Sequence, residues 1–287
     1  MPTNEDSRFL EIQKRAQAVY EQYAASASQW RNFLVYGDFG TGKTSMFATA
    51  PRPIFIDSFD PGGTKTKALQ PLIASGDILI DNSWETDSWK APFAYREWEK
   101  VMAQREKDGF FDYIGTYGLD SITKWADSCM FETLRLGGKN SGPRTGGIPE
   151  KKDYLVQQMT TVDWIGRIMA LPCHTVMTGH IGLITDEVSG RSETGLLLSG
   201  KLSGKVPLAF DEKYITRVEK TPKGIKHQLQ TKTDGVYKAE TRMGGDLFSM
   251  FETPDLRALL LKAGLPADDK PRLFPDSPNS SSEEPKP

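Results

Sequence analysis

Residues 33–44 read Phe-Leu-Val-Tyr-Gly-Asp-Phe-Gly-Thr-Gly-Lys-Thr, an apolar run that leads directly into a glycine-rich loop. The loop fits the pattern G-x-x-x-x-G-K-[ST], which binds phosphate groups when a strand precedes it and a helix follows it. The apolar run predicts that strand. Residues 45–50 predict the beginning of the helix, which Pro51 and Pro53 end. The stretch therefore predicts an α/β domain that binds a nucleoside triphosphate.

Each residue type in this loop suits a part of a bound triphosphate. Glycine at 37, 40 and 42 allows backbone conformations that point N–H groups at phosphate oxygens. Lys43 adds a positive charge for the β- and γ-phosphates, the hydroxyl of Thr44 is a ligand for Mg²⁺, and the helix N-terminus favours negative charge. We expect ATP with Mg²⁺ to contact Gly37, Asp38, Phe39, Gly40, Thr41, Gly42, Lys43, Thr44 and Ser45.

Outward from the loop, apolar runs alternate with helical patterns. Strands are predicted at 54–56, 78–80, 110–119, 174–179, 214–218, 225–231 and 236–241, and helices at 84–107, 121–136, 154–170 and 255–263. Such alternation predicts a mainly parallel sheet flanked by helices. We expect one α/β domain over residues 28–264.

The two ends of the chain differ from this domain. Residues 1–27 contain an amphipathic helix over 8–25, either packed on its own domain, which we favour, or serving as an arm on a neighbouring subunit. Residues 265–287 are rich in Pro, Ser, Asp and Glu, which predicts a disordered tail.

Composition limits the kinds of function. The chain has 287 residues and a formal net charge of −2, so a nucleic-acid surface would have to be a local basic patch. Cys129 and Cys173 form no C-x-x-C pair, which argues against structural zinc and a disulfide framework. The polar N-terminus and the lack of an apolar run of about 18 residues predict a cytoplasmic protein without a membrane partner.

Two carboxylates follow predicted strands. Asp120 could hold Mg²⁺ through water, while the alternative role is a helix N-cap, and both can hold at once. Asp60 could orient or activate water, or it could simply be a turn residue before Pro61. Asp57 lies inside the strand end, which favours a structural role.

His180 ends an apolar strand and precedes a long glycine-rich segment. It is either an ordinary strand-end residue or a sensor of the γ-phosphate. Two glycine-rich segments, 137–152 and 181–205, also carry cations that suit a single-stranded DNA backbone, although interleaved acidic residues fit simple solvation equally well. These cations are Lys139, Arg144, Lys151, Lys152, Arg191, Lys201 and Lys205.

The order of these motifs resembles the RecA-like ATPase core, and more closely the phage-encoded single-strand annealing proteins of the Sak type. The resemblance covers about residues 31–262. It is carried by residues 36–44, 54–63, 111–122, 175–180, 199–212 and 238–242. It implies DNA-dependent ATP use, a homo-oligomeric ring or filament on single-stranded DNA, and strand annealing or exchange in the host cytoplasm.

The resemblance also implies roles for single residues. The segments near 137–152 and 181–204 would contact DNA, and His180 would be the sensor, a position that is commonly Gln in that group. Arg242, with Lys238, would reach the γ-phosphate of a neighbouring subunit. The chain departs from the pattern because RecA has a catalytic Glu where strict register places Phe59, so Asp60 requires a shift of one residue. Gly115 and Gly118 also dilute the apolar strand.

The sequence therefore supports an ATP-dependent protein that binds and anneals single-stranded DNA. The alternative is a P-loop ATPase that loads or remodels a protein partner in DNA replication, for example a single-strand-binding or replication protein. A nucleotide-gated scaffold without hydrolysis is a third hypothesis. A metabolic kinase is disfavoured because no arginine-rich lid is apparent.

Overall fold

This computed structural model describes residues 4–26, 30–137, 148–185, 192–222 and 224–274. The chain divides into two compact units. Met1–Trp30 contains the helix α1 (Asn4–Ser26), which begins earlier than the sequence pattern predicts. Arg31–Pro287 contains all other elements. None of the helices in the described ranges combines the length and apolar character that crossing a membrane requires.

A sheet forms the centre of the larger unit. Its strands are β1 (Asn32–Gly37), β2 (Ile54–Ser58), β3 (Ile78–Asp81), β4 (Thr116–Asp120), β5 (His174–Thr185), β6 (Ser192–Leu196), β7 (Glu212–Thr221), β8 (Gly224–Gln230), β9 (Glu240–Thr241) and β10 (Phe251–Glu252). They lie in the order β10-β8-β7-β1-β5-β4-β2-β3, with β6 on β5 and β9 on β7. From β7 to β3 all neighbours are parallel. Because β5 separates the P-loop strand β1 from the strand that ends in Asp120, the order is that of the RecA-like core, and the predicted fold class is confirmed.

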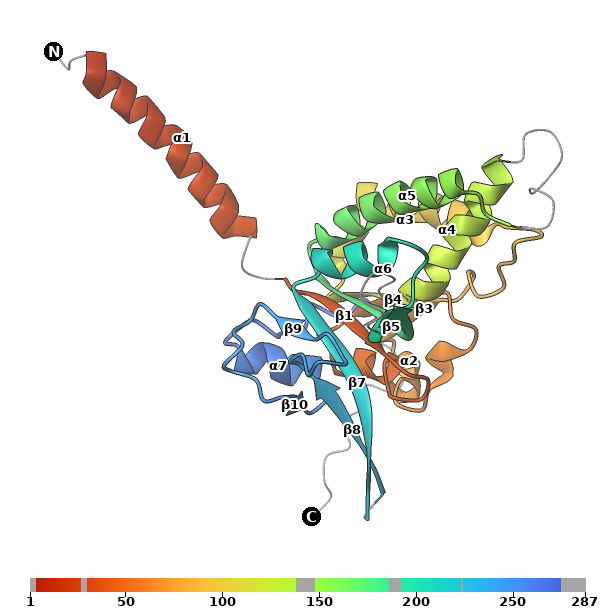
Figure 1. The fold of residues 1–287 in the computed structure, drawn as a ribbon. Coiled ribbons are helices and arrows are strands. Elements are labelled where there is room, and N and C mark those ends of the chain that lie inside the picture. Colours follow the sequence, from red (N-terminus) through yellow and green to blue (C-terminus); the bar gives the residue numbers. More distant parts are fainter. Residues whose placement is uncertain (1–3, 27–29, 138–147, 186–191, 223, 275–287) are drawn as a thin grey trace. The chain divides into compact units, whose positions relative to one another are not determined.

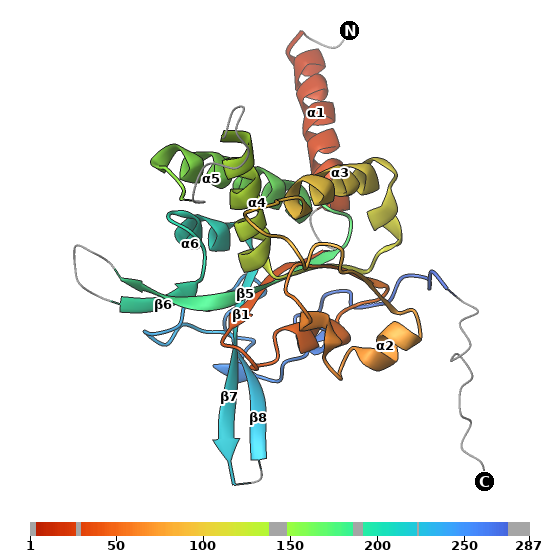
Figure 2. The ribbon, with the colours of Figure 1, turned by 90° about the vertical axis from the view of Figure 1, so that its right-hand side faces the viewer.

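Helices cover both faces of this sheet (Figures 1 and 2). They are α2 (Gln70–Ala74), α3 (Ala94–Lys107), α4 (Ile122–Gly137), α5 (Lys151–Met169), α6 (Leu202–Lys205) and α7 (Leu256–Lys262), with short 3₁₀ helices at Thr44–Thr49, Gly63–Lys65, Phe110–Tyr113 and Val206–Ala209. Figure 1 shows α3, α4 and α5 on one side of the sheet and α2 and α7 on the other.

The alternation of side chains along β1 explains the two covered faces. Leu34 and Tyr36 join a core with the tryptophans of α3, α4 and α5. Phe33 and Val35 join a second core with α7 and the 3₁₀ helix that follows the P-loop. Because successive side chains of a strand point to opposite faces, an entirely buried run such as 33–36 requires cover on both sides.

Three predicted elements are wrong in part. The predicted strand 110–119 begins with a 3₁₀ turn at Phe110–Tyr113, because Gly109 is left-handed (φ 68°) and Phe111 packs into the core, so the strand is only Thr116–Asp120. The predicted helix 84–107 begins at Ala94, where the carboxylate of Asp87 accepts hydrogen bonds from the N–H groups of Phe93 and Ala94. The strand predicted at 236–241 is only Glu240–Thr241.

Close packing requires Gly118 in β4 and Gly115 directly before this strand. A Cβ at Gly118 would lie 2.5 Å from Cε1 of Phe47, which belongs to the 3₁₀ helix after the P-loop. A Cβ at Gly115 would lie 2.3 Å from the carbonyl oxygen of Arg52. The two glycines that dilute the apolar strand thus allow the P-loop segment to press against β4.

The described part of the glycine-rich segment 181–205 contains a β-hairpin and a short helix. Strand β5 continues to Thr185 and pairs with β6 in an antiparallel hairpin, and α6 follows. The strands β7 and β8 form a second hairpin, in which Val218 lies opposite His227.

Residues 265–274 belong to the folded domain, which therefore extends past the predicted boundary at 264. The ammonium group of Lys270 donates hydrogen bonds to three backbone carbonyls, at 2.8 Å to Pro172, 3.0 Å to Asp112 and 3.3 Å to Phe111. Ala267 is buried, and Asp269 pairs with Arg257. The rest of the predicted tail, 275–287, lies outside the described residues.

Candidate nucleotide-binding site

The P-loop joins β1 to the 3₁₀ helix Thr44–Thr49, so the predicted helix is short. Gly40 and Gly42 adopt φ of 74° and 98°, which side chains with a Cβ adopt only with strain. The ammonium of buried Lys43 donates to the carbonyls of Gly37 at 3.0 Å and Asp38 at 2.8 Å. These two carbonyls of the P-loop therefore fix the position of the ammonium group inside the loop. Burial lowers the pKa of Lys43, and the charges of Asp120, Asp60 and Asp38 oppose this.

Thr44 and Asp120 meet at the carboxyl ends of β1 and β4. The Thr44 hydroxyl donates to Oδ2 of Asp120 at 2.9 Å, and the Thr178 hydroxyl donates to the other oxygen. Asp120 is 1% exposed, and burial raises its pKa to about 6, with the charge of Asp60 adding to the shift and the Thr178 bond opposing it. A hydroxyl and a buried carboxylate within hydrogen-bond distance are the hard oxygen donors that Mg²⁺ prefers. These two residues fit the predicted metal site.

Asp60, in the turn after β2, and His180, in β5, form a pair. Nε2 of His180 lies 2.9 Å from Oδ2 of Asp60. The position of Asp60 is fixed because its N–H donates to the carbonyl of Asp120 at 3.1 Å. Burial acts to raise the pKa of Asp60, but the hydrogen bond and charge of His180, together with Ser121 and Lys124, hold it below its usual value. The pair therefore favours an ionised carboxylate beside the P-loop.

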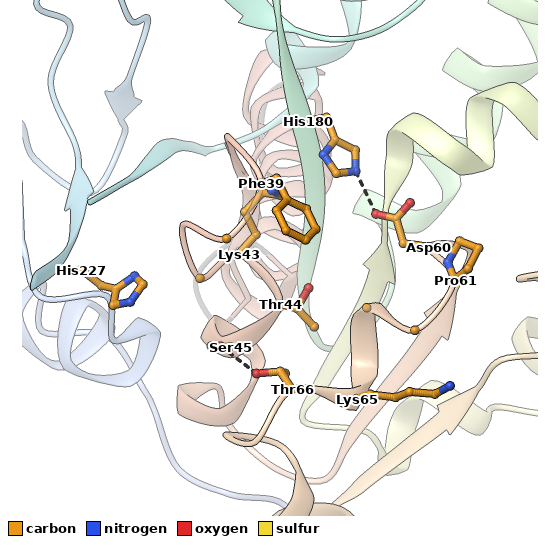
Figure 3. A pocket seen from close by; sticks show the side chains of 14 residues that line it. Phe39, Lys43, Thr44, Ser45, Asp60, Pro61, Lys65, Thr66, His180 and His227 are labelled. Carbon is orange, nitrogen blue, oxygen red and sulfur yellow. Dashed lines mark hydrogen bonds and ion pairs between the residues drawn. The ribbon is translucent and has the colours of Figure 1, made fainter. Parts of the chain in front are cut away.

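Lys43, Thr44 and the Asp60–His180 pair line one cavity of about 600 Å³ (Figure 3). Its walls are the P-loop, the Asp60-Pro61-Gly62-Gly63 turn, Lys65, Thr66, His180 and His227. Phe39, at the tip of the loop, is almost fully exposed at 95%. A carboxylate, a histidine and a lysine around this cavity can bind a phosphate chain and orient a water molecule.

Asp57 and Phe59 are directed away from this cavity. Asp57 is fully buried and accepts hydrogen bonds from Trp84, Trp98, Tyr117 and Arg105. Phe59 is buried against Trp84 and Trp98. The residue of this turn that faces the P-loop is therefore Asp60, despite the shift of one residue from strict register.

Arg242 lies outside the cavity of its own chain. It follows β9, is exposed, and lies 3.4 Å from Oδ1 of Asp211. Lys238 also does not line this cavity, and its carbonyl accepts the hydroxyl of Tyr36. Arg242 is therefore not part of the nucleotide cavity of its own chain.

Of the four described cations of the two glycine-rich segments, three lie around one cavity. Lys151, Lys152 and Lys201 line a second cavity of about 560 Å³ with Tyr154 and Leu155. Lys205 ends the neighbouring helix α6 but does not line this cavity. Lys139, Arg144 and Arg191 lie outside the described residues.

The sequence did not indicate His227. It lies on β8, and its Nδ1 is 3.0 Å from the carbonyl oxygen of Thr41 in the P-loop. Its approach depends on the register of the β7–β8 hairpin. Pro222 and Gly224 mark a turn in the sequence, but they do not indicate which residue of the hairpin reaches the P-loop. Lys65 and Thr66 were likewise missed, and Thr66 lies 3.3 Å from the hydroxyl of Ser45.

Comparison with known proteins gives one family and distant structural likenesses. A family model described as an AAA domain matches residues 30–243. A KaiC-like protein from Pyrococcus horikoshii is 11% identical over 74% of this chain and 83% of its own, with a TM-score of 0.37. The flagellar accessory protein FlaH from Methanocaldococcus jannaschii is 10% identical over 78% of this chain and 84% of its own, with the same TM-score of 0.37. No curated protein matches the sequence.

Proposed function

The chain belongs to the AAA domain family, as a P-loop ATPase of the RecA-like type, and we propose that it uses ATP with Mg²⁺ to bind and anneal single strands of DNA. The observation that carries the DNA step is the second cavity. There Lys151, Lys152 and Lys201 come together beside Tyr154, although 49 positions separate Lys152 from Lys201. We further propose that it works as an oligomer in the cytoplasm of a phage-infected host.

The nucleotide step rests on the first cavity. Lys43 and the loop backbone would hold the phosphates, and Thr44 with Asp120 would hold Mg²⁺, whose charge stabilises the phosphate oxygens. Asp60, kept ionised by its bond to His180, would accept a hydrogen bond from the attacking water and orient it. In this assignment the buried carboxylate of Asp120 would contact the metal, and the half-buried carboxylate of Asp60 would contact the water.

The chemistry of the second cavity suits a single strand. Exposed lysines can contact backbone phosphates, and an aromatic ring offers a face to a base whatever its identity. Lys151 and Lys152 are exposed, and Tyr154 is 41% exposed. The site would therefore bind by charge and stacking and would have little sequence preference.

Strand β5 supplies a route between the two cavities. His180 lies at the nucleotide, and the same strand continues into the β5–β6 hairpin. The backbone carbonyl of His180 accepts the N–H of Leu197, four positions before Lys201. A change in the Asp60–His180 contact would thus shift the segment around Leu197, which leads to Lys201 in the second cavity.

Oligomerisation would give Arg242 a role in catalysis. Since it lies outside its own cavity and is exposed, it could reach the γ-phosphate of a neighbouring subunit. Loss of turnover in Arg242→Ala, with recovery in mixtures with Lys43→Ala, would support action between subunits.

The test of the DNA step compares the double variant Lys151→Glu/Lys201→Glu with the wild type and with Lys107→Glu, an exposed lysine on α3. Affinity for labelled oligo-dT and ATP turnover with and without DNA are measured across salt concentrations. We expect the wild type to bind with a steep salt dependence, and the double variant to lose affinity and about 0.7 of logarithmic slope per lost contact. The Lys107 variant should behave as the wild type. Turnover that ignores DNA, with no complex at low salt, would refute the DNA step.

One observation favours a second function, the loading or remodelling of a protein partner. Helix α5 exposes a row of apolar side chains, Leu155, Met159 and Val162, at 57%, 66% and 44%. Exposed apolar rows of this kind often bind proteins. If Met159→Asp abolished stimulation by a replication protein while the lysine variants had no effect, this second function would replace the first.

A further inference from the structure

A small cavity adjoins the nucleotide cavity on the side away from Asp60. Its volume is about 180 Å³, and it is lined by Thr41, Gly42, Ser45, Met46, His227 and Pro254. Gly42, Ser45 and His227 line both cavities, whereas Asp60 and His180 line only the larger one. In Figure 3 His227 and the Asp60–His180 pair stand on opposite sides of the P-loop.

A triphosphate held by this loop has a defined direction. The lysine of a P-loop reaches the β- and γ-phosphates, and the loop backbone holds the α- and β-phosphates. The γ-phosphate therefore belongs near Lys43 and the Asp60–His180 pair. The α-phosphate, with the sugar and base beyond it, then belongs near Ser45, where the small cavity begins.

The orientation of His227 leaves its ring faces available. The Thr41 carbonyl can only accept, so Nδ1 carries the proton and donates at 3.0 Å. A Cβ at Gly42 would lie 3.3 Å from this same Nδ1, which shows that the edge of the ring meets the loop. The side chain is otherwise exposed, and Met46 and Pro254 add apolar lining close by.

We propose that this small cavity is the binding site for the nucleobase, and that the imidazole of His227 stacks on the base. The same ring then ties the β7–β8 hairpin to the base and, through Thr41, to the P-loop. The inference rests on the proposed use of ATP and is independent of the DNA step. His227 could instead only brace the P-loop through Thr41, and this alternative predicts a different result for a ligand without a base.

The test measures binding by calorimetry with Mg²⁺ and without DNA, for ATP and for inorganic tripolyphosphate. We expect His227→Ala to bind ATP roughly tenfold more weakly, because an aromatic face that stacks on a base is lost. Tripolyphosphate affinity should not change. His227→Phe keeps a flat face but loses the bond to Thr41, and it should bind ATP much as the wild type does.

Two results would overturn the base site. Equal losses for ATP and tripolyphosphate in His227→Ala would leave His227 as a brace of the loop, and an unchanged ATP affinity would leave it without a role in binding. If the wild type bound neither ligand, the proposed use of ATP would fail as well, so the two failures are distinguishable. Unfolding curves of both variants show whether they are folded.

Discussion

Strand β5 carries two histidines whose side chains have opposite roles, one at the amino edge of the parallel sheet and one at its carboxyl edge. His174, at the first residue, is 2% exposed, and its Nδ1 accepts the N–H of Arg31 at 3.1 Å. His180, six positions on, has a side chain that is 29% exposed and bonds to the carboxylate of Asp60 at the nucleotide cavity. At the amino end of the sheet, polar side chains such as those of His174 and Thr175 bond to the backbone or to neighbouring side chains and stabilise the fold. At the carboxyl end they bond to one another around a cavity, which leaves them able to bind a ligand.

The largest effect should follow from Lys43→Ala at the carboxyl end. Without the ammonium that faces the phosphates, ATP turnover should fall roughly hundredfold to thousandfold. Lys65→Ala is the matched control, because Lys65 lines the same cavity without a hydrogen bond to the loop among the described contacts. Phosphate release measures both, and comparable losses in the two variants would contradict the role given to Lys43.

At the amino end, the next largest effect should depend on pH. Burial, with the charges of Arg31 and Lys270, lowers the pKa of His174 to about 4. The folded state therefore takes up this proton later than the unfolded state, so stability is complete above about pH 6.5 and is lost as the pH falls towards 4. The shift corresponds to about 3 kcal/mol of unfolding free energy. Urea unfolding across this range should give a flatter profile for His174→Gln than for the wild type, and parallel profiles would contradict the assignment.

The Asp60–His180 pair should show a smaller effect, on turnover and not on stability. Asp60→Asn removes the negative charge and basicity that would activate the attacking water, so turnover should fall roughly hundredfold while ATP binding persists. Because the two side chains act as a unit, the double variant with His180→Gln should lose little more than Asp60→Asn alone. Losses that multiply would show that the two residues act independently.

The smallest effect should come from Lys270→Met, again at the amino end. It removes the hydrogen bonds to three carbonyls while keeping the length of the side chain. The unfolding free energy should fall by about 1–2 kcal/mol, with turnover unchanged. Equal stability of variant and wild type would mean that these three hydrogen bonds add nothing to the stability of the folded domain.

Sequence reasoning was most successful where a local motif and its flanking strands decide the structure. The phosphate loop, the alternating strands and the carboxylates after them identify the fold and predict that Asp60, Asp120 and His180 come together. They do so because the carboxyl ends of parallel strands share one edge of the sheet. The structure places all three at that edge.

What the sequence did not predict depends on contacts between distant segments. The approach of His227 to Thr41 spans 186 positions and requires the register of a hairpin. The start of α3 depends on the Asp87 carboxylate, which accepts from N–H groups at Phe93 and Ala94, and the 3₁₀ turn at Phe110–Tyr113 has the aromatic composition of a strand. Composition also classed residues 265–274 as tail, since the carbonyls that hold Lys270 come from other parts of the chain.

The contact between Gly118 and Phe47 has a consequence for the history of this chain. The ring of Phe47, in the 3₁₀ helix after the P-loop, leaves no room for a Cβ at Gly118 on β4. The two residues are therefore complementary in shape. Natural selection should therefore act on the two positions together. Homologues that carry alanine or a larger residue at 118 should have lost the aromatic ring at 47, and ancestral reconstruction should find the two changes on the same branch.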